Sequence, residues 1–124
     1  MKRAAVLVAL GVAAFGIALP ATASAAPRAA YVNDPPQCQG GADPGWMCAY
    51  EHEGFTGHSV GMYDCGNYTI PFYTTGSWDD EQYGHVQPWL YWVDSTRAPW
   101  HMPPAISYQR TGVDWRRVLS ITNC

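Results

Sequence analysis

Apolar and polar residues alternate along the segment 46–65, and this alternation predicts two β-strands joined by a turn. The large side chains share one face of each strand: Trp46, Cys48 and Tyr50 on the first, and Val60 and Met62 on the second. Between the strands, Gly54 and Gly57 accept positive φ, and Phe55 lies between them. We therefore expect a β-hairpin whose aromatic ring folds back over the turn.

The rest of the chain shows the same preference for strands. It is rich in Gly, Pro, Tyr, Trp and Thr, and its apolar residues do not recur at helical spacing. Candidate strands cover residues 46–52, 58–64, 68–73, 89–93, 106–110 and 117–123. Turn residues separate them, as at Thr75-Gly76. We predict an all-β sandwich, with residues 88–104 forming a long loop that lies against it.

The amino terminus has the pattern of a secretory signal peptide. Lys2 and Arg3 precede an apolar run, and Ala23-Ser24-Ala25 supplies small residues for cleavage. A membrane anchor is the alternative, but the run is short and meets Pro20. We expect residues 1–25 to be a signal peptide, 26–37 a flexible lead-in and 38–124 the domain of a secreted, extracellular protein.

Charge limits the partners of the exported chain. After signal cleavage five arginines remain against ten acidic residues, and no lysine is left, so the net charge is −5 with neutral histidines. Nucleic acids and anionic membranes require clustered positive charge. The sequence thus predicts neither partner, and we expect a monomer.

Four cysteines, all in the exported part, indicate two disulfides formed in an oxidising compartment. Three pairings are available. We favour Cys38 with Cys48, which closes the approach to the first strand, and Cys65 with Cys124, which ties the hairpin to the last residue. A cysteine metal site is less well supported because the chain has no C-x-x-C spacing.

The hairpin resembles a known signature. Tyr50-x-x-x-x-Phe55-x-Gly57, followed by Ser59, is similar to the hairpin of the βγ-crystallin Greek key. The resemblance implies a small Greek-key β-sandwich held by the two disulfides. It also implies that Phe55 covers the folded hairpin, that Gly57 adopts a conformation closed to side chains, and that Ser59 hydrogen-bonds the turn backbone.

A narrower resemblance covers residues 48–67. With Cys48 before the hairpin and Asp64-Cys65-Gly66 after it, this segment is similar to the actinobacterial metalloproteinase inhibitors, peptidase inhibitor family thirty-six. This similarity implies an inhibitor that blocks an extracellular metalloprotease with a rigid, disulfide-held loop. A rigid loop binds with little ordering cost.

Microbial βγ-crystallin domains often bind calcium through Asn/Asp-Asn/Asp-x-x-Ser/Thr-Ser, whose oxygens suit a hard cation. Asp79 and Asp80 match the acidic start of that motif, but Tyr83 and Gly84 stand where the hydroxyl oxygens belong. The motif is therefore degraded, and these two aspartates are the candidate calcium ligands. We expect no other cofactor.

The chain has no recognisable catalytic motif, because it contains neither G-x-S-x-G nor H-E-x-x-H. We therefore expect a binding protein and not an enzyme. The candidate binding surface is aromatic: Trp89, Tyr91, Trp92 and Trp100. It would contact an extracellular protease or, alternatively, a polysaccharide as a cell-wall or carbohydrate-binding module. A structural, stress-related role is the third hypothesis.

Overall fold

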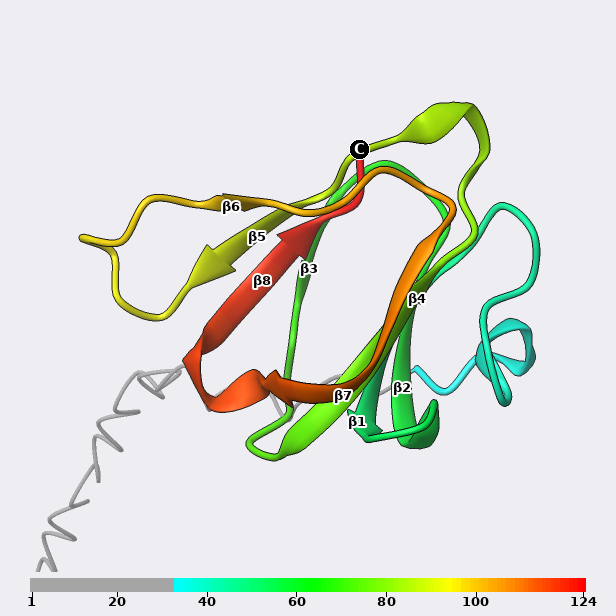
Figure 1. Ribbon diagram of the computed structural model, residues 1–124, viewed down its shortest axis with the longest axis horizontal. Helices are drawn as coiled ribbons and strands as arrows, with labels where there is room; N and C mark the ends of the chain where they lie inside the picture. Colours follow the sequence, from blue (N-terminus) through cyan, green and yellow to red (C-terminus); the bar gives the residue numbers. More distant parts are fainter. Residues whose placement is uncertain (1–32) are drawn as a thin grey trace, which may run out of the picture.

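The computed structural model describes residues 33–124, which form eight strands and three one-turn 3-10 helices (Figure 1). The strands are β1 (Met47–His52), β2 (Thr56–Met62), β3 (Asn67–Thr69), β4 (Thr75–Asp80), β5 (Trp89–Trp92), β6 (Trp100–His101), β7 (Ser107–Asp114) and β8 (Val118–Thr122). The helices are η1 (Pro36–Cys38), η2 (Tyr83–His85) and η3 (Trp115–Arg117). Within this range, no helix is long and apolar enough to cross a membrane.

The strands form two antiparallel sheets of four, which confirms the predicted all-β class. Their orders are β2-β1-β4-β7 and β3-β8-β5-β6. The first sheet contains β1, β2 and β4 of the first four strands, and the second contains β5, β6 and β8 of the last four. The third strand of each group, β3 or β7, lies in the opposite sheet. In Figure 1, β3 crosses from the β1–β2 hairpin to lie beside β8, and β7 crosses in the opposite direction to lie beside β4.

The central strand β4 was missed by the sequence analysis, which placed a turn at Thr75-Gly76. Instead, β4 pairs with β1 on one side and with β7 on the other. Glycine and aspartate are poor strand formers, and this strand carries Gly76, Asp79 and Asp80. All three are buried. Neighbouring strands on both sides therefore impose the conformation against local propensity.

The prediction of a long loop at residues 88–104 is also wrong, because this stretch contains the β5–β6 hairpin. Trp89 pairs with His101, and Leu90 pairs with Trp100. The hairpin extends away from the body of the sandwich (Figure 1). Its second strand is only two residues long, too short for a periodic pattern to reveal it.

Strand β1 is buried on both faces, although the sequence predicted a half-buried strand. Met47 and Ala49 face the core between the sheets, together with Trp78, Trp115 and other apolar side chains. The opposite face carries a second cluster, made by Cys38, Cys48, Tyr50 and Phe55. The chain before β1 and the folded hairpin together cover what would otherwise be the solvent face of the sheet.

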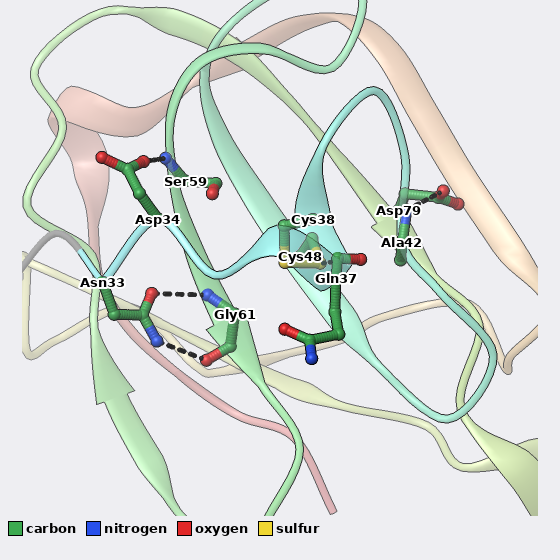
Figure 2. Close-up of a disulfide and its surroundings, with 9 residues drawn as sticks. All are labelled: Asn33, Asp34, Gln37, Cys38, Ala42, Cys48, Ser59, Gly61 and Asp79. Atoms are coloured by element: carbon green, nitrogen blue, oxygen red, sulfur yellow. Dashed lines mark hydrogen bonds between the residues drawn. A yellow bond between two sulfur atoms is a disulfide. The ribbon is translucent and has the colours of Figure 1, made fainter.

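Both disulfides have the pairing that we favoured, Cys38 with Cys48 and Cys65 with Cys124. Figure 2 shows the first, beside a segment that runs along the edge of β2. There the Asn33 side chain accepts from Gly61 N at 2.8 Å and donates to Gly61 O at 3.0 Å. Part of the expected lead-in is therefore bonded to the sheet. The predicted signal peptide, and residues 26–32, lie outside the described residues.

Candidate functional site

The folded hairpin of the sequence signature is built as a closed unit. The rings of Tyr50 and Phe55 lie 5.4 Å apart, centroid to centroid, and both side chains are buried. Gly57 has a φ of +77°, and a Cβ there would lie 2.7 Å from Cδ2 of His52. The turn is also tied to the far edge of the sheet, because Gly54 N donates to Arg110 O at 2.8 Å. These residues hold the scaffold together.

Ser77 of β4, and not Ser59, makes the hydrogen bonds that we expected to hold this turn. Its hydroxyl accepts from Phe55 N at 2.9 Å and donates to His52 O at 2.7 Å. Ser59 instead donates its backbone N–H to Asp34 at 2.7 Å (Figure 2). Ser77 could not be predicted from the sequence, because no strand was expected at β4.

The candidate calcium ligands Asp79 and Asp80 are consecutive residues of a strand, so their carboxylates project to opposite faces. Asp79 accepts a hydrogen bond from Ala42 N at 2.8 Å (Figure 2). Asp80 is fully buried; one carboxylate oxygen accepts from Gln82 N at 3.2 Å, and the other has no hydrogen-bond partner. Within residues 33–124 no three His, Cys, Asp or Glu side chains converge as metal ligands.

Burial raises the pKa of Asp80 from the ordinary 3.8 to about 6, with the charges of Asp79 and Glu81 adding to the effect. The folded state then binds a proton more tightly than the unfolded state, so stability falls as the pH rises from about 4 to about 6. We expect Asp80→Asn to remove this loss and to stabilise the domain at pH 7 by about 2–3 kcal/mol. Urea unfolding at pH 4 and at pH 7 measures the difference.

The exposed Asp64 offers a matched control, because Asp64→Asn removes a carboxylate that is not buried. Because Asp80 is still present, the Asp64→Asn variant should keep the fall in stability between about pH 4 and pH 6. Parallel profiles for the wild type and Asp80→Asn would contradict the assignment to Asp80.

The aromatic residues of the candidate binding surface divide between two faces of β5. Leu90 and Trp92 pack against the core, whereas Trp89 and Tyr91 lie on the other face. Trp89 and Trp100 are 38% and 40% exposed. The structure thus places all four predicted residues in one hairpin, but it does not bring them onto one surface.

Two of these indole rings are already covered by the chain's own side chains. The Trp89 ring stacks on His101, with centroids 4.0 Å apart and an interplanar angle of 3°. The Arg97 guanidinium carbon lies 3.6 Å from the centroid of the Trp92 ring. Sequence reasoning missed Arg97, because its partner is set by the path of the loop between β5 and β6.

That loop, residues 93–99, is exposed along its whole length but is held by its own hydrogen bonds. Asp94 accepts from the backbone N–H and the hydroxyl of Thr96, at 3.0 and 2.7 Å. Arg97 N donates to Asp94 O at 3.1 Å. The Trp92 indole donates to Ala98 O at 3.0 Å, and Val93 N donates to Arg117 O at 2.9 Å. The loop is therefore preorganised.

Three hollows adjoin the Trp92–Arg97 pair, with volumes of about 220, 370 and 380 Å³. The smallest reaches the core beside Leu90 and Val118. A more voluminous groove of about 730 Å³ lies beside the β1–β2 hairpin and is lined by Asp34 and His58, which are paired at 2.7 Å. Most of that lining belongs to the scaffold described above. The β5–β6 hairpin is therefore the better candidate binding site.

Comparisons of the chain with protein-family models, with curated proteins and with solved structures found no match.

Proposed function

We propose that this is an exported binding protein of the peptidase-inhibitor type with a βγ-crystallin-like Greek-key fold. Two features support the fold assignment: the hairpin closed by Tyr50, Phe55 and Gly57, and the exchange of third strands between the two sheets. Export is supported by two disulfides, because such bonds persist in oxidising compartments.

The loop at residues 93–99 is the observation that carries the functional proposal. A protein that blocks another by surface contact benefits from a loop that is exposed and already ordered, because binding then requires little further loss of entropy. Every residue of this loop is exposed, yet its turns are held by the hydrogen bonds from Trp92, Val93 and Thr96. It also lies at the end of a hairpin that projects from the sandwich (Figure 1).

The side chains around the loop favour a protein partner over a polysaccharide. Sugar rings stack on open aromatic faces, but Arg97 covers one face of Trp92, and His101 covers one face of Trp89. Tryptophan and arginine are among the residues enriched at the centres of protein interfaces. The proposed target is an extracellular protease, with a metalloprotease of the thermolysin type as the first choice because of the sequence resemblance.

Inhibition assays with a thermolysin-like metalloprotease and a serine protease test this function. We expect the wild type to inhibit, and Val93→Gln to weaken inhibition by about tenfold through loss of apolar contact. Val93 is 61% exposed in the loop. Ile106, which is 70% exposed outside the loop, provides the matched control, and Ile106→Gln should inhibit like the wild type.

The opposite results are equally informative. No inhibition of either protease, together with retention of the wild type on insoluble polysaccharide, would favour the carbohydrate-binding alternative. Equal inhibition by all three proteins would place the contact surface elsewhere than the loop.

A further inference from the structure

Positive charge is concentrated around Trp92 in an otherwise acidic molecule. The described residues contain four arginines, and three of them, Arg97, Arg116 and Arg117, line the hollow of about 380 Å³ beside this ring. The remaining one, Arg110, lies over Phe55 on the folded β1–β2 hairpin. An acidic group on a partner is therefore attracted to this hollow and repelled by most of the remaining surface.

The three arginines differ in how many of their guanidinium N–H groups already have an acceptor within the protein. Arg116 binds Asp114 through two hydrogen bonds, at 2.8 and 3.2 Å. Arg117 makes only a longer ion pair with Asp114, at 3.6 Å. Arg97 makes no ion pair and no side-chain hydrogen bond with any of the residues 33–124. The guanidinium groups of Arg97 and Arg117 thus retain N–H donors for a carboxylate.

Trp92 fixes the position of the Arg97 guanidinium. Its ring lies 3.6 Å from the guanidinium carbon and is itself held by the hydrogen bond to Ala98 O. An arginine stacked on an aromatic ring keeps its planar fork of donors free at the rim of that ring. Asp94 is the acidic residue that lines this hollow; its Oδ1 accepts both hydrogen bonds from Thr96, and the described residues show no ion pair between Asp94 and Arg97. It therefore competes only weakly for Arg97.

Arg97 and Arg117 also border the smaller hollow, of about 220 Å³. Its walls include the apolar side chains of Trp78, Leu90 and Val113, and Asp114, the ion-pair partner of Arg117, lies at the same rim. This volume is below the several hundred Å³ of a typical small-molecule site. It suits a single apolar side chain of a protein partner. The two guanidinium groups would meet a carboxylate immediately beside that side chain.

We propose that the β5–β6 hairpin recognises a protein segment in which an acidic residue adjoins a large apolar one. The apolar side chain enters the 220 Å³ hollow, and the carboxylate accepts hydrogen bonds from Arg97 and Arg117. This inference rests on the proposed function, since it names the chemistry of the partner that the same hairpin contacts.

Two blocked tetrapeptides serve as probes: acetyl-Ala-Phe-Asp-Ala-amide and its neutral counterpart acetyl-Ala-Phe-Asn-Ala-amide. Titrations are followed by the ¹H–¹⁵N signals of the Trp92 and Trp100 indoles. We expect the aspartyl peptide to shift these signals and to bind about tenfold more tightly than the asparaginyl peptide, because it makes charge-assisted hydrogen bonds. Added salt should reduce the preference.

Two arginine variants complete the test. Arg97→Gln should reduce the preference for the aspartyl peptide at least threefold, because only Arg117 then remains to bind the carboxylate, whereas Arg110→Gln, which removes the arginine stacked on Phe55, should retain it. The inference is overturned if the wild type binds neither peptide at millimolar concentration, if it binds both equally, or if the two variants lose the preference to the same extent.

The same variants separate this inference from the proposed function. A preference for the aspartyl peptide without inhibition of any protease would retain the site and remove the inhibitor proposal. Protease inhibition that Arg97→Gln leaves unchanged, with no preference between the peptides, would retain the inhibitor proposal and remove the site.

Discussion

Replacing Gly76 by alanine is expected to destabilise the domain by about 3–5 kcal/mol and to leave little folded protein at 37 °C. Gly76 lies in β4, next to the hydrogen bond of 2.7 Å that the Trp115 indole donates to Tyr50 O. A Cβ at this position would overlap both of those atoms. Trp115 is fully buried and Tyr50 O belongs to the neighbouring strand, so neither can move without loss of packing.

Urea unfolding followed by tryptophan fluorescence measures the effect, and Gly66→Ala provides the matched control. A Cβ at Gly66 would have its nearest neighbour, Cε2 of Tyr68, at an ordinary 3.6 Å. We expect this control to change stability by less than about 1 kcal/mol. A loss for Gly76→Ala as small as that of the control would mean that a shift of the backbone relieves the crowding around Gly76.

The hairpin could be predicted from the sequence because its information is local. Its glycines, its aromatic residues and its alternation all fall within residues 46–65. β4 could not be predicted in this way. Its conformation is imposed by β1 and β7, and its side chains act at a distance: the hydroxyl of Ser77 holds the turn between β1 and β2. A polar residue that serves a remote segment gives no periodic signal.

For a related reason, the sequence predicted the region of the candidate site but not the arrangement of its side chains. The density of tryptophans pointed to the region of β5, but the direction of each ring depends on the strand pairing. The partner of Trp92 depends on the turn at Asp94 that brings Arg97 back over the ring. That turn has recognisable residues, Asp94-Ser95-Thr96. Local propensity predicts the turn, but it does not predict that the turn places Arg97 over the ring of Trp92.

The two hairpins of the molecule hold corresponding places in the two sheets but end differently. The β1–β2 hairpin is folded down, with Phe55 buried and Gly54 bonded to the backbone of β7. The β5–β6 hairpin keeps its loop exposed and projects from the sandwich (Figure 1). The first hairpin uses its aromatic rings and its glycines to close the fold. The open one is free to contact a partner, which is why we place the proposed function there.

Removing the disulfide between Cys65 and Cys124 with a pair of serine substitutions is expected to lower the free energy of unfolding by about 4 kcal/mol. The bond closes a loop of 59 residues in the unfolded chain, and the entropy it removes grows with that length. Both cysteines are exposed, so serine creates no buried polar group there. Urea unfolding of the double variant, Cys65→Ser with Cys124→Ser, measures the loss.

The other disulfide provides an internal comparison, because the Cys38–Cys48 bond closes a loop of only 10 residues. Mild reduction should open the exposed Cys65–Cys124 bond first, since Cys38 and Cys48 are buried, and should bring the wild type to the stability of the double variant. A loss below about 1.5 kcal/mol would show that residue 124 stays beside residue 65 without the bond. The two hydrogen bonds between Gly66 and Asn123, at 3.0 and 3.2 Å, would then be the main tie between β8 and the loop before β3.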